Sequence, residues 1–168
     1  MGLHRKEVSP MVLFTIRSMV LADYPAFDRF DGALHAMHQQ ARPDLFAPCK
    51  HLFTQADFEK LLASPNEIAL IAEVGGRPAG ICMATIKEPP AAPFLHPVKA
   101  AHIGDLYVSE EYRRAGVGRA LIESVKRAAR EKGAGRITLM VWPFNSDALH
   151  FYEKLGFATR SVTLEAKL

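Results

Sequence analysis

The sequence is poor in the features that mark secreted, membrane-spanning and disulfide-bonded proteins. Its two cysteines, Cys49 and Cys82, form no C-x-x-C pair, so we expect free, buried thiols in a reducing compartment. No uncharged apolar run approaches the roughly 18 residues that a membrane-spanning helix needs. The basic start, Met1–Lys6, is followed by an apolar stretch, but Arg17 interrupts that stretch and no small-residue cleavage site follows. We therefore expect a cytoplasmic protein without a membrane anchor.

The chain also has little net charge. The 168 residues include 21 Lys and Arg against 18 Asp and Glu, which gives a net charge of +3, and 49% of the residues are hydrophobic. The densest basic stretches, residues 113–119 and 126–132, are short, whereas a nucleic-acid-binding protein gathers its excess charge along a stripe. They are better suited to small anions such as phosphates. Length and composition predict a single domain over residues 1–168 that binds no nucleic acid.

The hydrophobic patterns alternate between strand and helix periods. They predict strands over residues 12–19, 67–74, 78–87, 100–108, 136–142 and 157–168. They also predict helices that begin near Asp23, Thr54, Gly116 and Asn145. Gly75 and Gly76 fit the turn of a hairpin, and the proline-rich residues 88–97 fit a surface loop. The fold class expected from this order is α/β, with one mixed sheet covered by helices on both faces.

The most specific stretch is a basic glycine loop between a strand and a helix. Its spacing is Arg113-x-x-Gly116-x-Gly118. The backbone N–H groups at a helix N-terminus attract anions, and we expect the glycines to let a phosphate approach the backbone. A dinucleotide-binding fingerprint would need glycine where Leu121 stands, and a P-loop would need Lys in place of Arg119. The loop therefore predicts an anion site of another kind.

This loop resembles the acyl-CoA pyrophosphate loop of the GNAT superfamily of N-acyltransferases. A second stretch, with Asn145, Ala148, Tyr152 and Gly156-Phe157, resembles a second motif of that family. The two motifs occur in the family's order within residues 100–157, about a third of the chain. Two motifs in order are more specific than either motif alone.

The resemblance implies a GNAT-type fold, a mostly antiparallel mixed sheet whose fourth and fifth strands splay apart. It implies transfer of an acetyl group from acetyl-CoA to a primary amine of a small molecule or peptide, by direct attack in a ternary complex and without a metal. The pantetheine arm would bind beside Leu106 and Val108 and contact Asn145. The pyrophosphate would bind at Arg113, Arg114, Ala115, Gly116, Val117, Gly118 and Arg119. Proteins of this family often form homodimers, so a homodimer is compatible with this sequence.

The resemblance also suggests catalytic groups. Tyr152 resembles the family's general acid, which protonates the leaving thiolate. For the general base we expect His102 first, since counting by twos along the strand places it on the same side as Leu106 and Val108. Asp105 is the second candidate and is expected on the opposite face, and transfer of the proton directly to water is a third route.

Other interpretations of the same residues stay open. The loop is also compatible with a tight turn, Tyr152 and His102 with core residues, and Asn145 with a helix N-cap. A rival zinc cluster could form from His35, His38, Cys49 and His51, although their spacing is not a strong metal signature. His35 and His38 could instead flank an acceptor pocket. Weak candidates for contacts with the acceptor are Asp31, Asp44, Phe46, Glu67 and Trp142. The competing functions are a non-catalytic acyl-CoA-binding module and an anion sensor.

Overall fold

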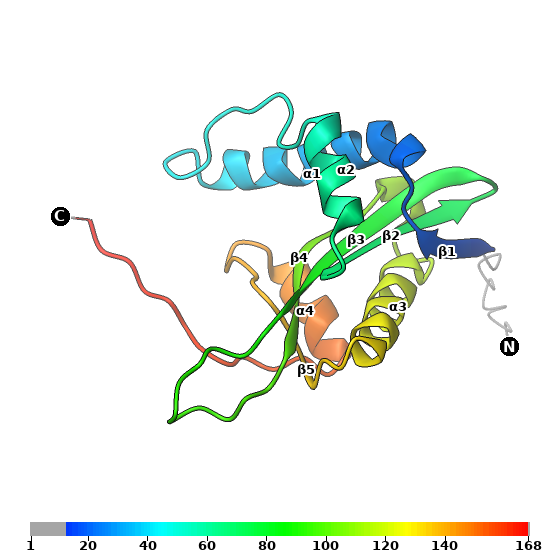
Figure 1. The fold of residues 1–168 in the computed structure, drawn as a ribbon. Helices are drawn as coiled ribbons and strands as arrows, with labels where there is room; N and C mark the ends of the chain where they lie inside the picture. The colour runs from blue at the N-terminus through cyan, green and yellow to red at the C-terminus, as the bar shows by residue number, and fades with distance from the viewer. Residues whose placement is uncertain (1–12, 168) are drawn as a thin grey trace, which may run out of the picture.

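The computed structural model describes residues 13–167 and shows a five-stranded sheet between two layers of helices (Figure 1). The strands are β1 (Phe14–Ser18), β2 (Glu67–Val74), β3 (Arg77–Lys87), β4 (Ala100–Val108) and β5 (Arg136–Leu139). The helices are α1 (Tyr24–Ala41), α2 (Gln55–Ala63), α3 (Val117–Glu131) and α4 (Ser146–Lys154), with short 3₁₀ turns at Leu21–Asp23 and Glu110–Tyr112. The sheet order is β1-β2-β3-β4-β5. The first four strands are antiparallel, and β5 runs parallel to β4. This is the mixed, mostly antiparallel sheet expected from the sequence.

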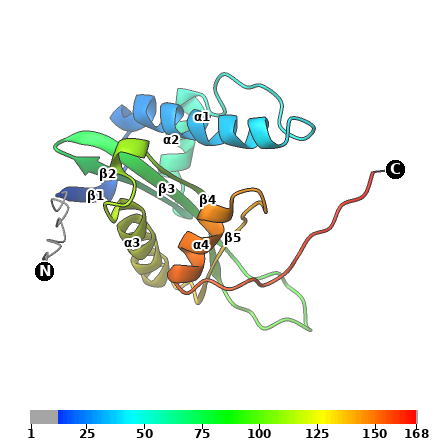
Figure 2. The same cartoon turned by 180° about the vertical axis from the view of Figure 1, so that it is seen from behind.

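The two helical layers bury different faces of the sheet. Helices α1 and α2 cover one face, where Phe27, Phe30 and Phe58 pack on Ile71 and Ile81. Helices α3 and α4 cover the other face (Figure 2), where α3 contributes a separate apolar cluster. That cluster contains Val117, Leu121, Ile122, Val125 and Ala129. Because each face has its own core, the direction of a side chain on the sheet decides which layer it meets.

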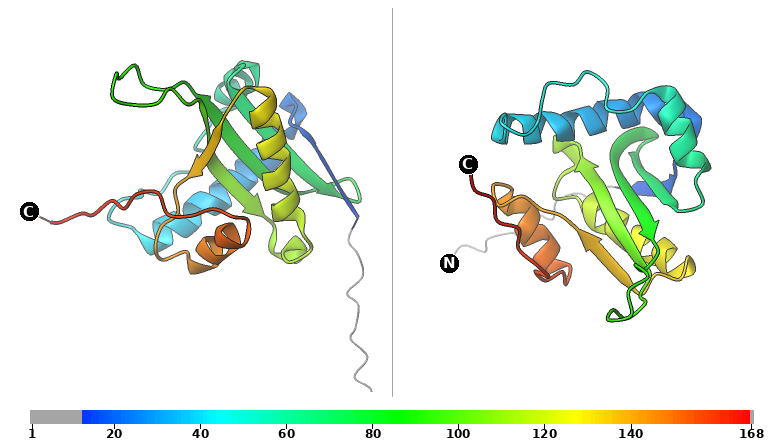
Figure 3. Two further views of the ribbon diagram at one scale, coloured as in Figure 1. Left: turned by 90° about the horizontal axis from the view of Figure 1, so that it is seen from below. Right: turned by 60° about the vertical axis from the view of Figure 1, so that its left-hand side comes forward.

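Strands β4 and β5 part after a short parallel pairing. Only Ala100–Ile103 pairs with Arg136–Leu139, whereas β4 continues to Val108 (Figure 3). The predicted strand over residues 136–142 is therefore shorter than expected. The edge of β4 after Ile103 has backbone groups that no strand among the described residues satisfies on the β5 side. This divergence confirms the splayed strands that the resemblance implied.

A β-bulge interrupts β4 at Gly104. Opposite β3, Ile103 pairs with Ala84 and Asp105 pairs with Met83, so Gly104 is an extra residue. A bulge of one residue reverses the alternation of side chains after it. Side chains of even-numbered residues before Gly104 therefore point to the same face of the sheet as those of odd-numbered residues after it.

Two further expectations from the sequence are wrong. Residues 158–167 form no strand: the segment runs outward from the end of α4, and Val162 and Leu164 are exposed (Figure 1). Alternation in a sequence makes a strand only where another backbone offers hydrogen bonds, and this segment pairs with none among residues 13–167. Cys49 is exposed on the loop after α1, although Cys82 is buried as expected.

Several local predictions are confirmed. Thr54 and Asp57 form a capping box at the start of α2, and the hairpin turn at Gly75 and Gly76 has φ angles of +56° and +75°. Within the described residues no helix has the length and apolarity to span a bilayer. The expectations about Met1–Lys6 and Val12 concern residues outside the described range.

Candidate active site

The basic loop lies at the N-terminus of α3 and has an unusual backbone. Arg114 has a φ of +64° and Gly116, the residue before the helix, a φ of +87°. A non-glycine residue in the left-handed region is uncommon and is often found at functional sites. The first α3 hydrogen bond runs from the Ala120 N–H to the Gly116 carbonyl at 3.0 Å, so the N–H groups of the first turn have no helical acceptor.

The arginines of this loop surround that first turn. Arg113, Arg114 and Arg119 are exposed, and no acidic residue lies in the first turn of α3. The Arg113 Nε donates a hydrogen bond to the Val108 carbonyl at 3.0 Å, which ties the loop to the end of β4. Helix N–H groups and exposed guanidinium groups together can hold a phosphate or pyrophosphate.

The remaining loop residues point inward. Val117 is buried, and Ala115 packs on the edge of the same core. A Cβ at Gly118 would lie 3.3 Å from Cζ of Phe151 and 3.6 Å from Cγ2 of Val108. The missing side chain of Gly118 therefore lets α3 pack closely against α4 and β4, and the approach of a phosphate to this glycine stays a prediction. At Gly116 a Cβ would meet no atom within 4 Å, and the positive φ explains the glycine instead.

His102 and Asp105 lie on the face of β4 that α1 and α2 cover. His102 pairs with Thr85 and Asp105 with Met83, and directly paired residues point to the same side of a sheet. Leu106 and Val108 instead pack on the α3 core. The expectation that His102 shares a side with Leu106 and Val108 is wrong, as is the placement of Asp105 opposite His102, because the bulge at Gly104 shifts the alternation.

The surroundings of these two side chains differ. The His102 Nδ1 lies 3.0 Å from Oγ1 of Thr138 on β5, and burial lowers the pKa of the imidazole. The Thr138 hydroxyl also lies 3.5 Å from the Ala101 carbonyl oxygen, so it has two possible acceptors. Burial raises the pKa of Asp105. The shift of Asp105 brings its pKa closer to neutral pH, whereas the shift of His102 moves its pKa away from neutral pH and keeps the imidazole uncharged.

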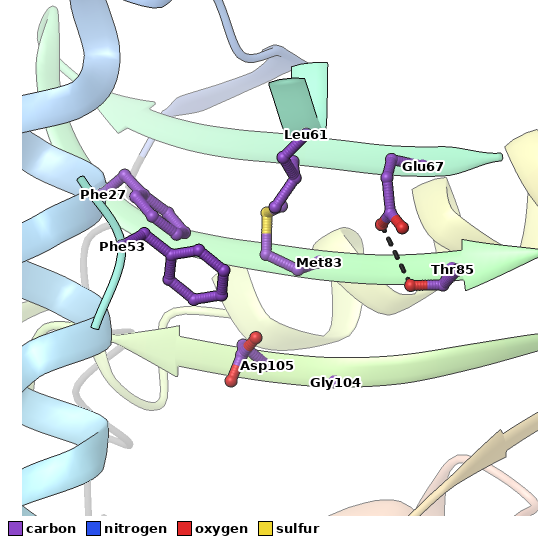
Figure 4. A pocket seen from close by; sticks show the side chains of 8 residues that line it. All are labelled: Phe27, Phe53, Leu61, Glu67, Met83, Thr85, Gly104 and Asp105. Carbon is purple, nitrogen blue, oxygen red and sulfur yellow. Dashed lines mark hydrogen bonds between the residues drawn. The ribbon is translucent and has the colours of Figure 1, made fainter. Parts of the chain in front are cut away.

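Asp105 borders a cavity of about 220 Å³ on this face of the sheet (Figure 4). Its lining residues come from α1, the loop before α2, α2 itself and strands β2 to β4. They are Phe27, Phe53, Leu61, Glu67, Met83, Thr85, Gly104 and Asp105. At one side of the cavity the Thr85 hydroxyl donates to a Glu67 carboxylate oxygen at 3.0 Å. A small polar molecule could bind here with its apolar part on Phe27, Phe53 and Met83.

Tyr152 lies on α4, between the rings of Phe151 and Phe157 at centroid distances of 5.2 and 5.5 Å. Burial raises the pKa of its phenol, and the nearby Cys82 and Asp105 add to this effect. The hydroxyl is therefore protonated at neutral pH and can donate a hydrogen bond or a proton.

Asn145 is the N-cap of α4, as one interpretation of the sequence held. Its side-chain oxygen accepts a hydrogen bond from the Ala148 N–H at 3.2 Å. The amide nitrogen of Asn145 remains available to another acceptor.

The histidine and cysteine residues that were candidates for a zinc cluster do not come together in one site. His35 Nε2 lies 2.9 Å from the Ala47 carbonyl, His51 pairs with Asp28, and His38 stacks on Phe46. No group of three or more His, Cys, Asp or Glu residues suited to a metal ion occurs within residues 13–167.

The weak acceptor candidates divide into two groups. Glu67 lines the cavity, and the buried Asp31 lies close enough to Asp105 for that carboxylate to affect its pKa. Phe46 and Asp44 instead lie in the segment after α1. Phe46 contacts Trp142 edge to face, and Asp44 forms an ion pair with Arg42. Sequence reasoning missed Met83 and Thr85 as cavity residues. The glycine within β4 could have indicated which face Asp105 takes, since glycine inside a strand often marks a bulge, but no local signal points to these two β3 residues.

Comparison with known proteins identifies the family. The sequence profile of the acetyltransferase (GNAT) family matches residues 34–157. The chain belongs to this GNAT family. A crystal structure of a mutant BH1408 protein from Bacillus halodurans has a TM-score of 0.87, with 24% identity over 92% of this chain and 99% of that one. At this identity the likeness establishes the fold.

Curated GNAT relatives match over shorter stretches. An N-alpha-acetyltransferase of Sulfurisphaera tokodaii is 37% identical over 92 residues, which cover 52% of this chain and 54% of the relative. An L-ornithine N5-acetyltransferase of Arabidopsis thaliana is 38% identical over 55 residues, 33% of this chain and 24% of the relative. This GNAT chain thus spans about half or less of the curated relatives that it matches.

Proposed function

We propose that the protein transfers an acetyl group from acetyl-CoA to a primary amine. The observation that carries this proposal is the basic loop at the N-terminus of α3, next to the part of the β4 edge after Ile103 that no strand within residues 13–167 pairs on the β5 side. Free N–H groups and three arginines suit the pyrophosphate, and the β4 edge at Leu106 and Val108 suits the amide groups of the pantetheine arm. Relatives named as acetyltransferases of N-alpha groups and of L-ornithine support an amine acceptor.

For the general base we favour Asp105, with His102 as the alternative. Asp105 borders the cavity in which an amine could bind, and burial raises its pKa toward neutrality. His102 lies on the same face but is hydrogen-bonded to Thr138. Asp105 would accept the proton that the amine loses as its nitrogen attacks the thioester carbon.

The remaining steps involve groups on the other side of the parted strands. As the carbon–nitrogen bond forms, negative charge on the carbonyl oxygen would be stabilised by a backbone N–H at Leu106 or Val108. The carbon–sulfur bond then breaks, and the Tyr152 hydroxyl would protonate the departing thiolate. Direct transfer in a ternary complex needs no covalent intermediate on the protein.

Calorimetric titration with acetyl-CoA tests this function without knowledge of the acceptor. We expect micromolar binding, no binding of NAD, and a weaker affinity in Arg119→Glu. Arg127→Glu is the matched control, because Arg127 is exposed on the same helix two turns farther from the loop. Absence of acetyl-CoA binding to the wild type, or equal losses in the two variants, would contradict the assignment of the loop.

A further inference from the structure

The cavity beside Asp105 has an apolar middle and carboxylates on two strands. Met83 on the central strand β3 lies between Glu67 on β2 and Asp105 on β4, with Phe27 and Phe53 beside it (Figure 4). Neighbouring strands are about 4.8 Å apart, so the backbones of Glu67 and Asp105 are separated by roughly 10 Å across the sheet. The cavity is therefore long enough to separate two charges by an apolar segment.

The charge of this cavity is of one sign. None of its eight described lining residues is a lysine or an arginine. Glu67 accepts one hydrogen bond, from Thr85, and its carboxylate has further acceptor sites. Burial raises the pKa of Asp105. A cationic group entering the cavity would meet acceptors at both ends.

Asp31 adds a third carboxylate behind the cavity. It lies one helical turn after Phe27 on the buried side of α1, and its exposed fraction is 4%. Burial and the charge of Asp105 raise its pKa to about 6. A cation bound at Asp105 would offset the repulsion between these two carboxylates, so the position of Asp31 is compatible with a cationic ligand in the cavity.

We propose that the acceptor is a short aliphatic diamine, bound with its reacting amino group at Asp105 and its second ammonium group at Glu67. The methylene chain would pack on Met83, Phe27 and Phe53. This inference rests on the proposed function, because it names the amine for the same site.

The same cavity disfavours two related classes of acceptor. A monoamine of equal length would leave Glu67 without a cationic partner. An amino acid that placed its carboxylate at Glu67 would suffer repulsion between like charges. Cadaverine, n-pentylamine and delta-aminovalerate share one carbon chain and differ at the far end alone, so they separate the three classes.

The experiment measures kcat/KM for these three amines at saturating acetyl-CoA. We expect a preference for cadaverine over n-pentylamine of about tenfold or more, the usual effect of a charge-assisted hydrogen bond, and the lowest value for delta-aminovalerate. Glu67→Gln keeps an acceptor for Thr85 but removes the charge, and should reduce the ratio of cadaverine to n-pentylamine about tenfold. Glu59→Gln on the exposed side of α2 is the control and should keep the ratio.

Each other outcome is decisive. Equal kcat/KM values for the three amines, or a ratio that Glu67→Gln leaves unchanged, would overturn the diamine inference while amine acetylation stands. Transfer to none of them by a protein that binds acetyl-CoA would likewise overturn the diamine inference alone. Failure to bind acetyl-CoA in the calorimetric titration would overturn the proposed function itself.

Discussion

His102 and Asp105 lie on the same face of β4 although three positions separate them, because Gly104 is a bulged residue. In a regular strand, residues at odd separations point to opposite faces. The bulge instead places both candidate bases on the side of the cavity and leaves Leu106 and Val108 in the α3 core. The pH dependence of the reaction can distinguish between the two candidates.

We expect Asp105→Asn to remove the acidic limb of the kcat/KM profile and to lower its plateau by about 10² or more. In the wild type kcat/KM should fall as the pH drops through the Asp105 pKa, because the protonated carboxyl cannot accept a proton. Since burial raises that pKa, the limb should lie above the range of an ordinary aspartate. The measurement is initial rates across pH with one amine.

His102→Gln provides the comparison for that profile. It should keep the limb, because glutamine can still hydrogen-bond to Thr138 and Asp105 is intact. Loss of the limb in His102→Gln but not in Asp105→Asn would reverse the assignment. Persistence of the limb in both would favour proton transfer to water.

Tyr152→Phe should lower kcat by about 10² or more and leave the affinity for acetyl-CoA nearly unchanged. The change removes the hydroxyl but keeps the ring between Phe151 and Phe157. Single-turnover rates and calorimetry would measure the two effects separately. Tyr112→Phe is the matched control, since Tyr112 packs on the same core near the basic loop. Equal turnover in wild type and Tyr152→Phe would reject Tyr152 as the acid.

Asp31→Asn should stabilise the protein at alkaline pH. Its carboxyl has a pKa of about 6 in the fold against a reference value of 3.8, so the folded state holds the proton more tightly. Stability is therefore lost as pH rises from about 4 through 6, by up to about 3 kcal/mol for a shift of this size. Urea unfolding at pH 8 and pH 4 should show a gain for the variant that disappears at the lower pH.

The exposed Asp147 supplies the control for that measurement. Asp147→Asn on α4 should change the free energy of unfolding by less than about 0.5 kcal/mol at either pH. A stability gain for Asp31→Asn that does not vary with pH would show that titration of Asp31 is not its cause.

Gly80→Ala should destabilise the sheet by about 1–3 kcal/mol, the usual cost of overpacking. A Cβ there would lie 2.6 Å from the Tyr107 carbonyl oxygen and 3.2 Å from the Val108 Cα, so the β3–β4 pair would have to open. Gly32→Ala on α1 has no atom within 4 Å of the added Cβ and should be neutral or stabilising. Chemical unfolding of both variants tests this contrast, and equal effects would contradict it.

Local signals in the sequence predicted most of the fold. Thr54 and Asp57 begin α2, Gly75 and Gly76 turn the hairpin, and Gly116 precedes α3, because each of these residues acts through its nearest neighbours. The apolar alternation of residues 157–168 predicted a strand that does not form, because a strand needs a neighbouring strand to pair with and a local pattern does not reveal one. The basic loop and Tyr152 were also visible as motifs.

The acceptor side of the site was harder to predict. Its residues come from five elements, and their convergence depends on the single extra residue at Gly104. Counting by twos across a bulge assigns every later side chain to the wrong face. Asp105 and Glu67 could be named as candidates, but their relation through Met83 and Thr85 required the tertiary structure.

The parting of β4 and β5 also has a kinetic consequence. The proposed donor site begins at the N-terminus of α3, whereas the cavity lies under α1 and α2, so the two substrates would enter from different layers. Neither substrate would obstruct the path of the other. Direct transfer then predicts double-reciprocal plots that intersect rather than run parallel, and product inhibition would show whether the two substrates add in random order.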